Sequence, residues 1–542
     1  MSVLLAGQAG ACPSGSLFDR TSALYERITR AQCDSLLGSL GSRRRRARSS
    51  RAHDPYAEAD DPIATGLEAL GPGDAARRDT RPVNELARRL AAGGLTRSPA
   101  APITILGRDP VLHSRHRIGE AAATALAIGA ASAAELLALR TSRLAAVRVD
   151  VGHAVASLLG FALQSTPDGD PGFDLVRGQP STTRIVRCRD DRFLHLHGGF
   201  PHLHEGILRL LECGDDPSAI EAAALAWSAF ELESALADRH LCGAVVRTPQ
   251  EWAEHPQGRS LREWPVVRIT KLGEAPVEAL PDGPTPLAGV RVLDATRVLA
   301  GPTCGRTLAQ YGADVLRIGS PKLPSVAPFV SETGHGKRSA FVDLETEQGR
   351  RCLDGLVRES DVFSDGYRPG ALARRGFGPE ALAAARPGIV AVSICCYGQA
   401  GPWATRPGWE QLAQSATGIA CVEGGAQTPR LIPAAATDYT TGYLAAYGAS
   451  EALRRRATEG GSWLVEVSLC RTAMWLQDLG ADLDPTTASG LPPIPPLQVT
   501  TATPRGALTH LRPAVELAGV EVGWQRPSVP LGHDPAVWLP RA

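Results

Sequence analysis

Short apolar runs alternate with helical segments along residues 286–481. The run VRVLDA predicts a strand, Gly301 and Pro302 turn the chain into a helix carrying Leu308 and Tyr311, and Gly312 ends that helix before the strand ADVLRI. The alternation continues through RSAFVDL, ETEQGRRCLDGLVRES, DVFSD, GPEALAAARP and GIVAVSI. It predicts an α/β fold with a doubly wound, mostly parallel sheet, in which ligands bind beyond the carboxyl ends of the strands.

An earlier part of the chain repeats the end of this region. Residues 119–160 and 437–480 both read as a long Ala-rich helix, a turn after Thr141 or Thr458, and an alternating strand. Counted back from the strands, the place of Asp438 falls near Glu120 and Ala121, so the first copy lacks the aspartate. The pattern predicts a partial internal duplication with two related units packed as a pseudo-pair.

Composition narrows the function classes. Lys+Arg 57 equals Asp+Glu 57, which gives no global field to recruit nucleic acid or an anionic membrane. We expect no apolar run to approach the ~18 residues that span a bilayer. The 11 cysteines contain no CxxC pair, which favours reduced thiols in a cytoplasmic protein.

The first hundred residues read as an appendage. Arg43 to Arg46 form a charge run, interpreted as a solvated arm in preference to a nucleic-acid site, and Cys12 ends a weak signal-like patch without a basic start. Helices are possible within residues 16–40 and 82–93.

Asp438 stands immediately before a helix predicted to begin at Tyr439. Free backbone N–H groups and the helix dipole there are expected to keep the carboxylate ionised and ordered. From the residues alone, a plain N-cap and a reactive carboxylate are both open.

Several sequence segments in residues 286–481 resemble the family III CoA-transferases, which include formyl-CoA transferase, carnitine CoA-transferase and the related alpha-methylacyl-CoA racemases. They are PLAGVRVLDATRVLAGP, GADVLRI, GKRSAFVDL, YRPGALARRGFGPEAL, YGQAGPWATRPGWEQLAQ, ATDYTTGYLAA and VEVSL. The resemblance implies a Rossmann-like sheet with a smaller α+β domain, and an interlocked homodimer or a pseudo-dimeric monomer.

The resemblance makes Asp438 the nucleophile. Its carboxylate would attack an acyl-CoA thioester, giving a mixed anhydride and then an aspartyl-CoA thioester that an acceptor acid resolves. CoA is thus a substrate, no permanent cofactor is expected, and the partners are an acyl-CoA and a carboxylic acid. A non-catalytic acyl-CoA-binding relative remains the alternative.

The same resemblance implies a CoA cradle. The turn after the first strand receives the nucleotide end, and a cationic pair with an aromatic ring contacts adenine and phosphates. The residues are Arg297, Val298, Leu299, Ala300, Lys337, Tyr367 and Arg374. The sequence departs from the family at Gly319 and Gly366, and the family's Gly-rich stretch after the nucleophile is absent.

Two other site interpretations are less favoured. Racemases pair the aspartate with a histidine where this chain has Trp409, which is neither an acid nor a base. His195, His197, His202 and His204 suggest a metal site, but no nearby carboxylate completes it, so no metal is expected.

These observations predict six segments along the chain. They are an appendage (1–100), a degenerate copy of the core (101–168), a small α+β domain (169–275), a linker (276–285), the main domain (286–481) and an extended Pro-rich tail (482–542).

Overall fold

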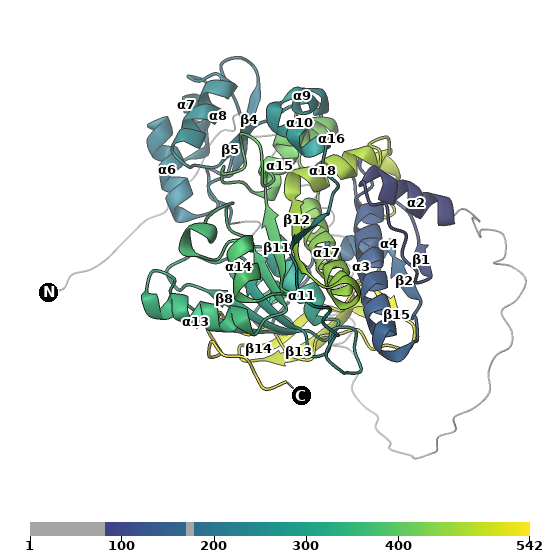
Figure 1. The fold of residues 1–542 in the computed structure, drawn as a ribbon. Helices are drawn as coiled ribbons and strands as arrows, with labels where there is room; N and C mark the ends of the chain where they lie inside the picture. Colours follow the sequence, from purple (N-terminus) through teal and green to yellow (C-terminus); the bar gives the residue numbers. More distant parts are fainter. Residues whose placement is uncertain (1–81, 170–177, 542) are drawn as a thin grey trace, which may run out of the picture. The chain divides into compact units, whose positions relative to one another are not determined.

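A seven-stranded sheet carries the elements that build the site (Figure 1). The computed structural model describes residues 82–169 and 178–541; the expected helix within 16–40, Cys12 and Arg43 to Arg46 lie outside them. The strand order is β6-β12-β11-β10-β7-β8-β9, with β7 to β12 parallel and β6 antiparallel at the edge. The strands are β6 (Arg268–Gly273), β7 (Arg291–Ala295), β8 (Asp314–Gly319), β9 (Lys337–Phe341), β10 (Val362–Asp365), β11 (Val390–Cys395) and β12 (Ser462–Ser468). The expected α/β class with a mostly parallel sheet is confirmed.

Both faces of this sheet are covered by helices. Val292 and Leu293 are fully buried neighbours on β7 but belong to two separate apolar cores, because successive side chains of a strand point to opposite faces. Four helices supply most of the cover. α11 (Ala300–Ala309) and α17 (Ala436–Glu459) pack in the core of Val292, and α13 (Glu347–Arg358) and α14 (Pro379–Ala385) pack in the core of Leu293.

The long helix α3 (Ile118–Thr141) packs along α17. Both helices have 24 residues, and Glu120 holds the third position of α3 as Asp438 does in α17. Each leads into a strand and a short helix: β2 (Val147–Asp150) with α4 (Val151–Ser157), and β12 with α18 (Leu469–Asp478). A second sheet joins β1 (Ile103–Leu106) and β15 (Glu516–Leu517) to β2.

Among the described residues, α3 is long and apolar enough to cross a membrane by length and composition. This corrects the expectation that no run approaches that length. Nearly all of the helix is buried against α17, α4 and the second sheet, and a buried core helix passes the same test.

A smaller α+β region lies between α4 and β6 in the sequence. Its antiparallel sheet has β3 (Arg184–Arg187), β4 (Phe193–Leu196) and β5 (Gly243–Val245). Its helices are α6 (Pro201–Leu211), α7 (Pro217–Ala224), α8 (Ala229–Asp238), α9 (Pro249–Glu254) and α10 (Pro256–Arg262). Thr248 and Glu251 form a capping box at the predicted start of α9. The region ends before residue 275, because β6 joins the main sheet.

The segment after residue 482 is not simply extended. β13 (Gln498–Thr503) and β14 (Gly506–Leu511) form an antiparallel hairpin, and β15 pairs with β2. The alternation in QVTTAT and GALTHL contains this signal, and Gly506 supplies the positive φ that the tight turn requires. The remaining elements are α2 (Pro82–Ala92), α12 (Ala327–Thr333), η2 (Ala373–Arg375), α15 (Glu410–Thr417), α16 (Ile419–Gly424), η3 (Pro485–Thr487) and η4 (Pro495–Leu497).

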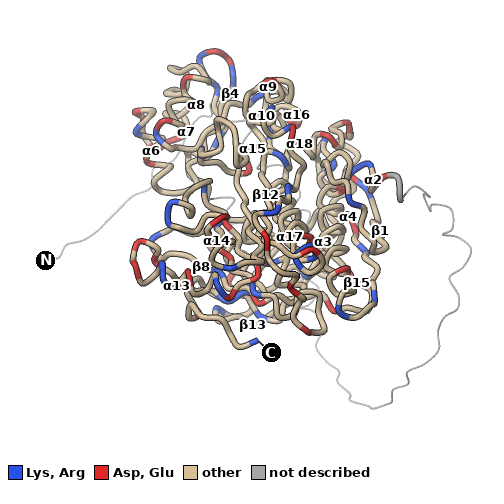
Figure 2. The backbone as a smooth tube through the Cα atoms, in the orientation of Figure 1, with Lys and Arg blue, Asp and Glu red and all other residues tan. Residues whose placement is uncertain are grey.

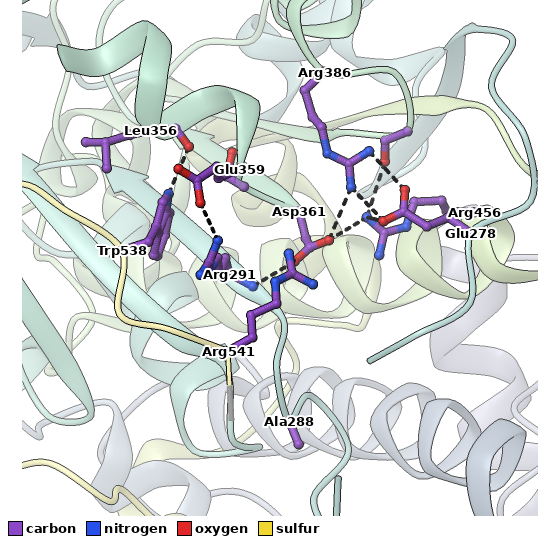
Figure 3. Close-up of polar contacts among 12 residues, drawn as sticks. Glu278, Ala288, Arg291, Leu356, Glu359, Asp361, Arg386, Arg456, Trp538 and Arg541 are labelled. Atoms are coloured by element: carbon purple, nitrogen blue, oxygen red, sulfur yellow. Dashed lines mark hydrogen bonds and ion pairs between the residues drawn. The ribbon is translucent and has the colours of Figure 1, made fainter. Parts of the chain in front are cut away.

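Charged residues of both signs are intermixed along the described chain (Figure 2). One cluster of charged residues, around Asp361 and Arg456, is buried. Asp361, just before β10, accepts hydrogen bonds from the backbone N–H of Arg291 (2.8 Å) and from the guanidinium groups of Arg456 (2.9 Å) and Arg541 (3.2 Å) (Figure 3). Arg386 lies 3.5 Å away. These contacts join the amino ends of the strands to the last turn of α17 and to the C-terminal segment.

Candidate active site

A cavity of about 810 Å³ lies at the opposite edge, beyond the carboxyl ends of the parallel strands. Ala295 of β7, Gly319 of β8 and Cys395 of β11 line it, as does the start of α6 at His202 and Leu203. This is the edge at which the α/β pattern predicts a ligand site, and the volume suits a cofactor-sized molecule.

Asp438 lines this cavity from the first turn of α17. The helix begins at Ala436, so Asp438 is its third residue and not the N-cap that the sequence suggested. The expected ionisation is also corrected, since burial raises the pKa of Asp438 to about 7 despite the nearby helix terminus. A carboxyl group that titrates near neutral pH in a cavity is a candidate for chemistry.

The cap of α17 comes from Glu410, the first residue of α15. Its Oε1 accepts hydrogen bonds from the backbone N–H (2.8 Å) and the Oγ1 hydroxyl (3.1 Å) of Thr437. Burial and the charge of Asp438 raise the pKa of Glu410 well above its usual range. The cavity therefore holds two neighbouring carboxyl groups, and the pair retains a proton at neutral pH.

Sequence reasoning missed Glu410. It directly follows Trp409, the position at which the racemases have a histidine. The signal lay in that position, 28 residues before Asp438.

Six of the seven predicted CoA residues line the cavity, namely Arg297, Val298, Leu299, Ala300, Tyr367 and Arg374. Lys337 does not. Its ammonium group is buried behind the turn, where it donates to Asp294 (2.6 Å) and to the carbonyl of Pro302 (2.7 Å). Lys337 therefore stabilises the core beneath the cavity, and we do not assign it to a bound molecule.

The turn from Arg297 to Ala300 is held in an uncommon conformation. Val298 has φ +66°, a left-handed value that costs a β-branched residue on the order of 1–3 kcal/mol. The turn also packs closely on α17, since a Cβ added at Gly442 would lie 2.6 Å from the carbonyl of Ala300. The packing thus holds this strained turn beside the helix of Asp438.

Basic side chains gather at one side of the cavity. Lys322 pairs with Asp343 (2.7 Å) and Arg375 pairs with Glu345 (2.6 Å). Arg368 and Arg374 also line the cavity, and neither has a carboxylate partner among the described residues. These cations fit the phosphate groups of a nucleotide, and Arg368, Lys322 and Arg375 were not singled out from the sequence.

Aromatic rings line the cavity near the carboxyl pair. Trp409 stacks on His197 with ring centroids 4.9 Å apart and meets Phe200 edge-on at 5.1 Å. His195 is hydrogen-bonded to Ser415 through Nδ1 (3.0 Å). Within residues 82–169 and 178–541, no group of three or more His, Cys, Asp or Glu side chains has a metal-binding arrangement.

Residues 287–493 match the family model described as CoA-transferase family III. These residues include the cavity-lining turn, Glu410 and Asp438. This region of the chain is therefore similar to CoA-transferase family III.

Several proteins that this chain is similar to over part of its length are named as CoA transferases. An acetyl-coenzyme A transferase of Hypoxylon pulicicidum is 33% identical over 323 residues, covering 54% of each chain. The beta subunit of a succinyl-CoA–L-malate CoA-transferase of Chloroflexus aurantiacus is 33% identical over 36% of this chain and 53% of its own. A formyl-CoA:oxalate CoA-transferase of Escherichia coli is 32% identical over 34% of this chain and 48% of its own. The chain thus spans about half the length of these relatives.

Solved structures also match part of this chain. A CAIB/BAIF family protein from Brucella suis aligns at 28% identity over 42% of this chain and 65% of its own, with a TM-score of 0.34. The crystal structure of Rv3272 from M. tuberculosis aligns at 30% identity over 36% of this chain and 58% of its own, also with a TM-score of 0.34.

Proposed function

We propose that this chain is a CoA-transferase that moves CoA from an acyl-CoA to a carboxylic acid, with Asp438 as nucleophile. The observation that carries the proposal is the pair of carboxyl groups, Asp438 and Glu410, on a cavity that also holds the turn and cations suited to CoA. The names of the relatives support the same reaction type.

Each step exchanges one acyl bond for another. The Asp438 carboxylate attacks the thioester carbonyl of the donor, forming a mixed anhydride and releasing CoA thiolate. The thiolate attacks the aspartyl carbonyl, so that the donor acid leaves and an aspartyl-CoA thioester remains. The acceptor carboxylate attacks this thioester and expels the thiolate, which then attacks the acceptor carbonyl of the new anhydride. Acyl-CoA leaves, and the Asp438 carboxylate is regenerated.

Glu410 has two roles in this proposal. As cap of α17 it holds the first turn, and with it Asp438, in place. In its protonated form it can donate a hydrogen bond to oxygen atoms that gain negative charge in the tetrahedral intermediates. The basic side of the cavity would hold the CoA phosphates, and the Val298 turn would lie along the rest of the molecule.

The proposal also covers how the sheet is wound and how α3 and α17 are related. We propose a doubly wound Rossmann-like sheet, with α3, β2 and α4 as a degenerate copy of α17, β12 and α18. The contact of α3 with α17 supports a pseudo-dimeric chain, with a homodimer as the alternative. We also propose a cytoplasmic location.

Adduct trapping tests the chemistry. The full chain is incubated with a panel of acyl-CoAs, quenched with hydroxylamine or borohydride, and analysed by intact mass and peptide mapping. We expect one modification, on the peptide holding Asp438, and none in Asp438→Ala. CoA binding without any adduct across the panel would favour the acyl-CoA-binding relative instead.

The pH dependence of kcat/KM gives an independent prediction. Because the nucleophile is the carboxylate and the pKa of Asp438 is about 7, we expect kcat/KM to fall about tenfold per pH unit below 7. In Glu410→Gln the acid limb should stay near pH 7 while kcat falls, because a protonated Glu410 and a glutamine are both neutral. An acid limb near pH 4 in the wild type would contradict the assignment.

A further inference from the structure

Three tyrosines follow Asp438 along one side of α17. Tyr439, Tyr443 and Tyr447 stand at intervals of four residues, so their side chains lie on the same side of the helix, and all three are buried. A Cβ added at Gly129 of α3 would lie 3.9 Å from the carbonyl of Tyr443 and 3.9 Å from Cβ of Tyr447, so this side of α17 faces α3. Buried phenol hydroxyl groups need hydrogen-bond partners, and these partners show what holds the helix.

Two of the hydroxyl groups bind residues 157–161, the turn at the end of α4, which we call the α4 turn. The Tyr439 hydroxyl accepts a hydrogen bond from the backbone N–H of Phe161 (3.0 Å), 278 positions away in the sequence. The Tyr443 hydroxyl donates one to Oγ of Ser157 (2.9 Å), 286 positions away. The α3–β2–α4 segment thus holds the first two turns of α17 through specific polar contacts.

The α4 turn also holds the residue that precedes α17. The backbone N–H of Ala435 donates to the carbonyl of Leu158 (3.2 Å). Asp438 therefore lies between Ala435 and Tyr439, both bound to the α4 turn, while Glu410 holds the same turn of the helix from α15. The first turn of a helix has unpaired N–H groups and frays most readily, so contacts from outside the helix decide how firmly Asp438 is held.

The ring of Tyr439 is held as well as its hydroxyl group. The Arg306 guanidinium lies 5.7 Å from the centre of the ring and is paired with Glu332. A Cβ added at Gly160 would lie 3.2 Å from the Tyr439 hydroxyl and 2.7 Å from Oε1 of Glu332, so the backbone of the α4 turn lies against both side chains. Tyr439 therefore has little freedom to move, and Asp438 is held with it as the adjacent residue.

We propose that the α4 turn positions Asp438 for attack. It fixes the first turns of α17 through Tyr439 and Tyr443, so that the carboxylate meets the thioester in a reactive geometry. These tyrosines and Ser157 are positioning residues, because they act through the helix and do not line the main cavity. This inference rests on the proposed function and gives the α3–β2–α4 segment a role in it. A nucleophile displaced by about 1 Å can react about 100-fold more slowly.

Removal of single hydroxyl groups tests the proposal. Tyr439→Phe keeps the ring and leaves the N–H of Phe161 without this partner. We expect the single-turnover rate of adduct formation on Asp438 to fall about 10- to 100-fold, while the Kd for CoA stays within about threefold. Tyr447→Phe is the matched control and should leave both quantities within about threefold. Its ring is also buried, but it lies roughly 12 Å further along the helix, beside Glu451.

A double-variant cycle tests the α4 turn as the partner. Ser157→Ala and Tyr443→Phe each remove one side of the same hydrogen bond. Each should slow adduct formation by about 3- to 10-fold, and the double variant should react no more slowly than Ser157→Ala alone. Multiplied losses in the double variant would mean that the two side chains act separately, and they would overturn the proposal. So would equal losses of rate and of CoA affinity in Tyr439→Phe, because they would assign the contact to folding alone.

The two levels of inference fail separately. If the wild type forms no adduct, the proposed function fails, and amide hydrogen exchange of the full chain still decides the role of the α4 turn. Exchange at residues 439–442 should be about tenfold faster or more in Tyr439→Phe than in the wild type, and unchanged in Tyr447→Phe. If Tyr439→Phe leaves exchange at these residues unchanged, the α4 turn does not hold the start of α17 and the proposal is wrong.

Discussion

Asp438→Asn is expected to lower kcat for CoA transfer by on the order of 1,000-fold or more, since an amide cannot form the anhydride. The substitution keeps the size of the side chain and leaves the Glu410 cap on Thr437 intact. CoA binding should therefore change little. Initial rates and equilibrium titration with CoA measure the two effects separately. Asp343→Asn is a matched control, because Asp343 lines the same cavity but is only half-buried and is paired with Lys322.

The same variant should be more stable than the wild type at pH 8. The pKa of Asp438 is raised from 3.8 to about 7 in the folded state, so the folded chain holds a proton that the unfolded chain loses. The stabilising contribution of the protonated group is complete below pH 3.8, declines as the pH rises, and is lost above pH 7. A neutral asparagine side chain removes the penalty of the buried charge, worth about 2–4 kcal/mol at pH 8. Urea unfolding at pH 8 and pH 5 should show a gain that shrinks at the lower pH, and a constant gain would contradict the buried-charge explanation.

Local sequence pattern predicted the sheet well because its strands are buried on both faces. Runs such as Val292 and Leu293 are apolar without interruption, and such runs between helical segments have few alternative folds. The tail was predicted less well. Its hairpin is half exposed, so prolines and polar residues obscured the alternation around Gly506.

The candidate site was only partly predictable for a different reason. Asp438 and the turn at Val298 stand in recognisable motifs, but the cap by Glu410 joins residues far apart in the sequence and depends on how α15 meets α17. Lys337 shows the opposite error: the family resemblance implied a lysine that contacts CoA, whereas Asp294 binds it in the core. Motif spacing indicates which residues can react, and only packing shows which way they face.

Asp361→Asn is expected to lower the free energy of unfolding by about 3–5 kcal/mol, because it leaves the fully buried Arg456 without its closest carboxylate. Asp354→Asn on α13 is the matched control. Its pair with Arg358 is exposed, so its loss should cost less than about 1 kcal/mol. Urea unfolding of both variants and the wild type measures the difference.

This loss should not extend to the chemistry of the folded protein. Asp361 binds the last turn of α17, whereas Asp438 lies in its first turn, 18 residues or roughly 27 Å before Arg456. Below the unfolding transition, Asp361→Asn should therefore keep the acid limb near pH 7 and the Asp438 adduct. If the adduct disappears while the chain remains folded, the ion cluster must position the nucleophile through the length of α17. If both properties persist, the amino edge of the sheet serves stability and the carboxyl edge serves catalysis.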